Sequence, residues 1–183
     1  MYRYLIQTIM LRKSDIYVLG GLLANEEQWS YRSLAERLHV PHSVVQRACS
    51  RAGDAGLYSA EMRVVHRPHF EEFAVHALRF VAPASLGALS PGIPAAWAAE
   101  PMAGAIRSYG EEPPPVWPSA RGEVRGQAVE ALHPAAVEAV ESWPELREIL
   151  ALIDSLRFGD LRLRKVAGDL LADALRHGIR KDR

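Results

Sequence analysis

The chain has 183 residues, of which 49% are apolar, and its 22 Lys and Arg residues balance 22 Asp and Glu residues. This apolar content is enough to build a buried core and excludes a globally disordered chain. The zero net charge excludes a polyelectrolyte binder of the histone-like type, although it allows a specific DNA-binding protein with clustered basic residues. A single cysteine excludes an internal disulfide and any cysteine-based zinc site.

The N-terminal segment from Met1 to Leu11 is apolar but short, and it carries no small-residue cleavage motif. We therefore interpret it as a packing or dimerisation segment, centred on Tyr4-Leu5-Ile6, rather than as a signal peptide. No apolar run in the sequence approaches the length of a membrane span. These features predict a cytoplasmic protein with no membrane partner.

A first helix is predicted from Ser14, a residue suited to the N-cap position, to Asn25. Its centre contains Gly20-Gly21, and each glycine weakens a helix by roughly 1 kcal/mol relative to alanine. A glycine pair inside a helix permits close approach of a neighbouring element. We therefore expect this helix to pack tightly against the helices that follow.

Two short helices separated by a tight turn are predicted next, from Tyr31 to Leu38 and over about 42–53. Ser30 is the expected N-cap of the first. The residues expected to face inward are Leu34, Ala35, Leu38, Val40, Val45, Ala48, Cys49 and Ala52. For Cys49 this position predicts a small buried core residue rather than a redox sensor.

The outward face of the second helix mixes hydrogen-bonding side chains with arginines, which suits base edges and phosphates. His42, Ser43 and Gln46 are the candidates for base edges, and Arg47 could reach a guanine or a phosphate. The candidates for phosphate contacts are Arg32, Arg51 and Arg63. Together these residues predict a helix that enters the major groove of DNA.

A short strand pair or abbreviated wing is predicted over 57–65, with Arg63 near its tip or base. Pro68 then opens a further helix, because proline is well tolerated in a first helical turn.

The composition changes sharply from Pro83 to Pro118, a segment that contains eight of the twelve prolines. No regular helix can run through it. Its apolar residues nevertheless indicate an irregular segment that covers either this protein or a partner subunit. Beyond it, Ser142 and Glu145 fit a capping box, and two amphipathic helices follow, separated by Gly159-Asp160 and ending near Gly178.

The pattern from Leu34 to Leu57 resembles the winged helix-turn-helix of MarR-like bacterial transcriptional regulators. The matching residues are Leu34, Ala35, Leu38, Val40, Ser43, Val45, Arg47, Gly56 and Leu57. This sequence departs from the pattern at His39, where the turn usually has glycine, at Pro41, which replaces a capping serine, and at Gly53. The resemblance covers roughly the first 80 residues and implies a DNA-binding regulator, most often a repressor.

Two histidine pairs, His39 with His42 and His66 with His69, have a spacing of three residues that could suit metal ligands. Zinc needs three or four converging ligands, and no recognised motif supplies them here. The sequence also lacks a glycine-rich phosphate loop and a nucleophile motif. We therefore expect no metal, no cofactor and no enzymatic activity.

The sequence as a whole predicts a mainly α protein with three regions. Residues 1–82 form a winged helix-turn-helix domain with a small β wing, residues 83–135 a proline-rich irregular segment, and residues 136–183 a C-terminal helical pair used for dimerisation. The expected function is sequence-specific binding of double-stranded DNA by a homodimeric transcriptional repressor. The alternative is a protein-interaction module, such as an antitoxin or operon partner, in which the 83–118 segment wraps another protein.

Overall fold

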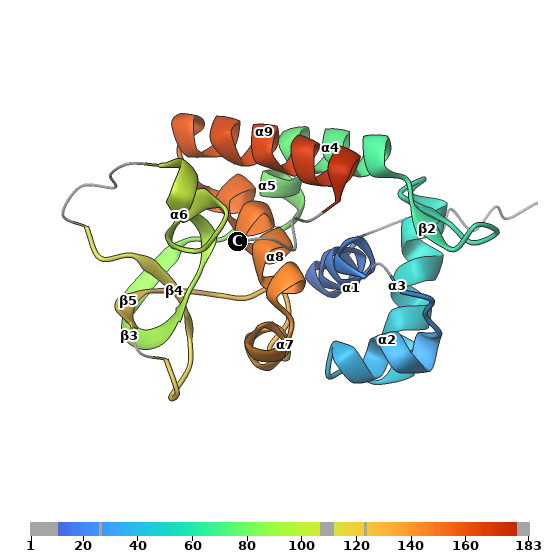
Figure 1. The fold of residues 1–183 in the computed structure, drawn as a ribbon, viewed down its shortest axis with the longest axis horizontal. Coiled ribbons are helices and arrows are strands. Elements are labelled where there is room, and N and C mark those ends of the chain that lie inside the picture. The colour runs from blue at the N-terminus through green and yellow to red at the C-terminus, as the bar shows by residue number, and fades with distance from the viewer. Residues whose placement is uncertain (1–10, 26, 107–111, 123, 179–183) are drawn as a thin grey trace, which may run out of the picture.

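The computed structural model describes residues 11–25, 27–106, 112–122 and 124–178. In this part of the chain the fold is mixed α/β, dominated by helices and completed by two small sheets (Figure 1). The packing segment predicted around Tyr4-Leu5-Ile6 lies outside the described residues.

The elements follow one another in three stretches of the described chain. The first contains α1 (Lys13–Ala24), α2 (Tyr31–Arg37), α3 (His42–Asp54), β1 (Tyr58–Ser59), β2 (Val64–Val65), α4 (Arg67–His76) and α5 (Leu78–Val81). The second contains β3 (Leu86–Pro94), the 3-10 helix η1 (Ala96–Ala98), α6 (Met102–Ala105), β4 (Pro115–Pro118) and β5 (Val124–Val129). The third contains α7 (Ala136–Ser142), α8 (Pro144–Phe158) and α9 (Leu161–His177).

Helix α1 lies between α8 on one side and α2 and α3 on the other (Figure 1). A Cβ atom on Gly21 would stand 2.8 Å from Cδ2 of Leu38, the residue that follows α2, so glycine at this position lets the Leu38 side chain pack closely against the α1 backbone. The expected tight packing at the glycine pair is confirmed. The predicted cap is wrong: α1 begins at Lys13 with Arg12 as its N-cap, because the carboxylate of Asp15 accepts a hydrogen bond from the Arg12 backbone N–H at 2.9 Å.

Helices α2 and α3 agree closely with their predicted bounds. Ser30 caps α2, and its hydroxyl oxygen accepts a hydrogen bond from the Ser33 N–H at 3.0 Å. All eight residues predicted to face inward are buried. Their exposed fractions are 1% for Leu34, 3% for Ala35, 0% for Leu38, 8% for Val40, 0% for Val45, 0% for Ala48, 3% for Cys49 and 0% for Ala52. The apolar spacing of the sequence therefore identified the buried side of both helices.

The predicted strand pair is confirmed as the antiparallel hairpin of β1 and β2, in which Tyr58 pairs with Val65 and Ser59 with Val64. Helix α4 then begins at Arg67, and Pro68 occupies its first turn as predicted. Its buried residues include Phe70, which is 0% exposed, and α4 lies alongside α9 (Figure 1).

The region predicted to be irregular, 83–135, instead contains β3, β4 and β5. Each of these strands hydrogen-bonds to the other two, so that the three close into a small barrel. Proline keeps a long helix from running through this region, which also contains the short helices η1 and α6. It allows strands, because its fixed φ suits extended backbone and its carbonyl still accepts hydrogen bonds. Pro115 O accepts from Ala95 N at 3.0 Å, and Pro114 O accepts from Gln127 N at 2.8 Å.

The C-terminal region contains three helices rather than the predicted pair. The predicted capping box is also wrong, because Ser142 ends α7 and α8 begins at Pro144, with Trp143 as a cap that makes no side-chain hydrogen bond. The turn before α9 holds as predicted: Asp160 Oδ1 accepts from Leu163 N at 2.8 Å. Helix α9 ends at His177, and the following residue, Gly178, has a φ of 81°.

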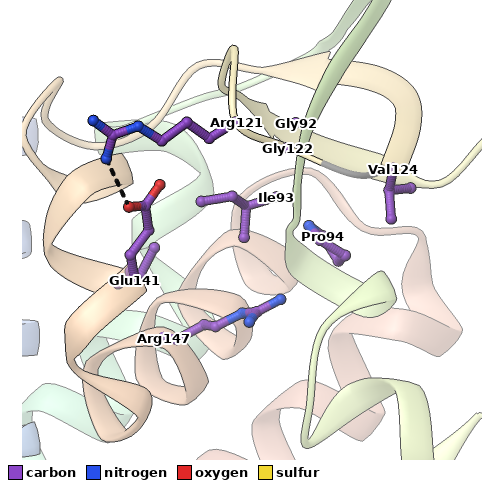
Figure 2. A pocket seen from close by; sticks show the side chains of 9 residues that line it. Gly92, Ile93, Pro94, Arg121, Gly122, Val124, Glu141 and Arg147 are labelled. Atoms are coloured by element: carbon purple, nitrogen blue, oxygen red, sulfur yellow. Dashed lines mark ion pairs between the residues drawn. The ribbon is translucent and has the colours of Figure 1, made fainter.

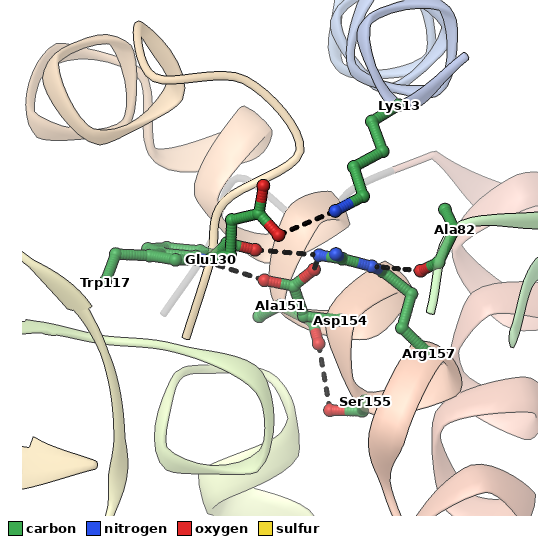
Figure 3. Close-up of polar contacts among 8 residues, drawn as sticks. All are labelled: Lys13, Ala82, Trp117, Glu130, Ala151, Asp154, Ser155 and Arg157. Atoms are coloured by element: carbon green, nitrogen blue, oxygen red, sulfur yellow. Dashed lines mark hydrogen bonds and ion pairs between the residues drawn. The ribbon is translucent and has the colours of Figure 1, made fainter. Parts of the chain in front are cut away.

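Helix α8 lies at the centre of the molecule and carries a buried polar network (Figure 3). Asp154 accepts hydrogen bonds from Arg157 Nη1 at 2.5 Å and from Trp117 Nε1 at 2.7 Å, while Arg157 Nε donates to Ala82 O at 2.8 Å. Burial raises the pKa of Asp154, and the Arg157 guanidinium opposes that shift. The network thus ties β4 and the end of α5 to α8.

Candidate nucleic-acid interface

The exposed side of α3 carries the side chains predicted to read bases. His42, Gln46 and Arg47 are exposed, and Ser43 is half-buried. Arg47 Nε donates a hydrogen bond to the Ser43 carbonyl oxygen at 3.1 Å, so the arginine lies back along the helix. Its remaining guanidinium donors leave it able to bind a further acceptor.

The turn before α3 sets the direction in which this face points. His39 adopts the left-handed conformation, with φ of 52°, at the position where glycine would be expected. The hydroxyl of Tyr17 donates to Leu38 O at 3.0 Å and holds the turn against α1. His39 Nδ1 also lies 3.8 Å from Glu138 Oε2, which connects the turn to α7.

Arg32 projects from α2 with 89% of its side chain exposed. Its Nε atom lies 3.8 Å from Glu36 Oε1, and the glutamate is itself 73% exposed. An ion pair this open to solvent contributes little. The guanidinium of Arg32 is therefore accessible to a phosphate.

Arg51 has a different environment from the other predicted contacts. Its Nε and Nη2 atoms donate to the two carboxylate oxygens of Asp15 at 2.7 and 2.5 Å, and the Asp15 side chain is fully buried. The hydrogen bond to Asp15 raises the pKa of Arg51. This two-point pair joins α3 to α1 and occupies the guanidinium that was predicted to hold a phosphate.

Arg63 lies in the turn of the hairpin, with φ of 57°. Its guanidinium stacks over the Trp29 ring, 4.5 Å from the ring centroid, and Nη2 donates to Trp29 O at 3.0 Å. The side chain is thus turned toward the segment that precedes α2. Its neighbour Met62 is 63% exposed.

Cys49 is buried on the inner side of α3, and burial raises the pKa of its thiol to about 11. A thiol with that pKa is almost entirely protonated near neutral pH, which describes a core residue rather than a reactive one.

The histidine pairs do not form a metal centre in the described ranges, where no three His, Cys, Asp or Glu side chains come together. The rings of His66 and His69 lie 5.3 Å apart, and His69 Nδ1 is 2.8 Å from Gly56 O. In the same ranges no helix is long and apolar enough to cross a membrane.

Sequence reasoning missed two features that depend on distant parts of the chain. One is Asp15, the partner of Arg51, which lies 36 positions earlier. The other is a cleft beside the barrel that contains Arg121 and Arg147 (Figure 2). Neither the Arg51–Asp15 ion pair nor the cleft leaves a local pattern in the sequence. The residues of each meet only after the helices and the barrel have packed.

Comparisons of this chain with protein-family models, with curated proteins and with solved structures found no match.

Proposed function

We propose that the protein is a homodimeric transcriptional regulator, acting as a repressor, that binds double-stranded DNA with α3 in the major groove. In this proposal α2, α3 and the β1–β2 hairpin serve as a winged helix-turn-helix. The exposed polar face of α3 is the observation that carries it. A helix of 13 residues is about 20 Å long and fits a groove about 12 Å wide.

The proposed contacts follow the exposure of each side chain. Gln46, Ser43 and His42 would meet base edges, because they share the accessible face at the start of α3. Arg47 and Arg32 would meet a guanine or the phosphates, since both guanidinium groups retain free donors. We leave Arg51 out of this surface because Asp15 already binds it at two points.

The alternative function, a protein-interaction module, has less support from the described part of 83–118, where Leu89 is 52% exposed but other apolar side chains are buried. A module that wraps a partner through 83–118 would need the apolar side chains of that segment, yet Met102 and Trp117 are 0% and 1% exposed within this chain's own core. The Trp97 ring packs against the Phe158 ring of α8, with ring centroids 5.2 Å apart and an interplanar angle of 53°. These contacts favour the DNA-binding proposal.

The test begins with the selection of a preferred site from a random DNA pool by the full-length protein. Fluorescence anisotropy at moderate salt then compares that site with a shuffled sequence, and we expect a preference of at least about a thousandfold. Gln46→Ala should weaken binding to the preferred site by about 5- to 150-fold and have little effect on shuffled DNA.

Gln127→Ala, a change of the same type in strand β5, is the matched control and should bind like the parent protein. A pool that yields no enriched sequence would contradict the proposal itself. Equal losses by Gln46→Ala on both DNAs would remove this residue from the base-reading set.

A further inference from the structure

An open cleft of about 530 Å³ lies between the three-stranded barrel and helices α7 and α8 (Figure 2). Its apolar walls are formed by Ile93 and Pro94 of β3, Val124 of β5 and Val140 of α7. On the barrel side, the backbones of Gly122 and Gly92 are in close contact, because a Cβ atom on Gly122 would overlap the backbone of Gly92. The volume falls within the range of small-molecule sites.

Two arginines enter this cleft, and they differ in how they are partnered. Nη1 of Arg121 lies 3.5 Å from Glu141 Oε2 at the rim, as the dashed line in Figure 2 marks. Arg147 extends from α8 beneath Ile93 and Pro94. Its side chain is half-buried and has no hydrogen bond or ion pair within the described part of the chain.

The charges that line the cleft indicate which ligand would fit. Among the described residues that line the cleft, Arg121, Arg147 and Glu141 together carry one net positive charge, which matches a single negative charge and disfavours a polyphosphate. A guanidinium presents a planar fork of donors that a carboxylate can accept at two points. The surrounding apolar side chains would cover the hydrocarbon part of such a ligand.

We propose that this cleft binds a small monocarboxylate with a compact apolar body, whose carboxylate is held by Arg147 and whose body packs on Ile93 and Val140. Arg121 and Glu141 form the rim beside the carboxylate. This inference goes beyond the proposed DNA binding and does not rest on it.

Calorimetric titration of the full-length protein at pH 7 with cyclohexanecarboxylate tests the proposal, with the uncharged cyclohexanecarboxamide as the matched ligand. We expect saturable binding of one carboxylate per chain and binding of the amide that is at least about tenfold weaker. Inorganic phosphate should not displace the carboxylate. Absence of saturable binding, equal binding of the amide, or displacement by phosphate would overturn the proposal.

Variants then locate the site. Arg147→Met keeps the unbranched stem and should weaken carboxylate binding by about 10- to 100-fold, whereas Arg162→Met on the exposed surface of α9 should leave it unchanged. Glu141→Gln removes a negative charge from the rim of the cleft and should tighten binding by about threefold or more, a gain that misfolding cannot produce. Parent-like affinity in Arg147→Met, or no gain in Glu141→Gln, would overturn the assignment.

Discussion

Arg47 and Arg51 stand four positions apart on α3, yet their surroundings give them different roles. Arg47 is exposed, and its one hydrogen bond goes to the preceding turn of its own helix. Arg51 is bound at two points by a carboxylate that has no exposed surface. The same residue type on the same helix therefore serves the proposed DNA surface in one case and the contact between α3 and α1 in the other.

Substitution of these two arginines should separate the two roles. Arg47→Ala should reduce the dependence of log Kd on log salt by about one unit, since one phosphate contact is lost. Arg51→Ala should leave that slope unchanged and lower the free energy of unfolding by about 2–4 kcal/mol, because it strands the buried Asp15 carboxylate. Salt titrations of DNA binding and urea denaturation provide the two measurements. A reduced salt slope in Arg51→Ala would return this residue to the DNA surface.

His133 links stability to pH. Burial lowers the pKa of His133, and its Nδ1 atom accepts a hydrogen bond from Ala135 N at 3.1 Å. The unfolded chain, with a histidine pKa near 6.5, therefore binds this proton more tightly than the folded one. The contribution of His133 to stability is present above the unfolded-state pKa of about 6.5, and it is lost progressively as the pH falls from there through the lower pKa of the folded state.

His133→Asn keeps an acceptor for the Ala135 N–H and removes the titrating group. We expect its free energy of unfolding to fall less than that of the parent between pH 7.5 and 5.5, as measured by urea denaturation. An identical fall in both proteins would show that His133 does not carry this pH dependence.

At the scale of elements, α1 shows how two adjacent glycines serve different contacts. A Cβ on Gly21 would meet three side-chain atoms of Leu38 at 2.8 to 3.2 Å, and Leu38 is fully buried. A Cβ on Gly20 would stand 3.2 Å from Cδ2 of Leu150 and at least 3.5 Å from Ile149 and Ile153. The contact of α1 with Leu38, at the end of α2, is thus the tighter one.

Alanine at each position in turn tests this difference. Gly21→Ala should lower the free energy of unfolding by about 1–2 kcal/mol, because overpacking outweighs the gain in helix propensity. Gly20→Ala should leave the free energy of unfolding almost unchanged, because a similar gain in helix propensity offsets the milder contact of the new Cβ with Leu150. Thermal and urea denaturation of both variants provide the comparison, and equal stabilities would contradict it.

Helices α2 and α3 could be predicted from the sequence and the barrel could not, because the contacts that define the barrel join residues far apart in the chain. The signals for α2 and α3 are local: Ser30 caps the first turn, and apolar residues such as Leu34 and Val45 recur at helical spacing. The barrel depends on pairings such as Ser90 with Gly126, which no local pattern encodes. The prolines of 83–118 were wrongly taken to exclude regular structure, because this segment contains β3, β4 and the short helices η1 and α6.

For the molecule as a whole, the buried residues form one core cluster that runs from α1 through α8 to α9. The outward face of α3 could be predicted because helical phase alone decides it. The ion pair between Arg51 and Asp15 and the cleft around Arg147 could not be predicted, because each joins elements that are far apart in the sequence. Ile149 and Ile153, which lie on α8 in the region predicted to serve dimerisation, are 1% and 0% exposed in this core.

The proposed homodimer therefore needs a test that does not disturb α8, since polar residues at Ile149 and Ile153 would unfold the chain. We expect light scattering at tens of micromolar to give twice the mass of one chain. We also expect the selected DNA to contain two half-sites about one helical turn apart, because a single reading helix contacts only a few base pairs.

Insertion of about five base pairs between the half-sites turns one of them to the opposite face of the duplex, about half a helical turn away. A dimer that holds both reading helices in fixed positions should then lose most of its affinity, whereas insertion of a full turn of about ten base pairs should restore part of it. Two chains that bind independently would tolerate both insertions equally. A monomeric mass together with full affinity for the inserted sites would contradict the dimer.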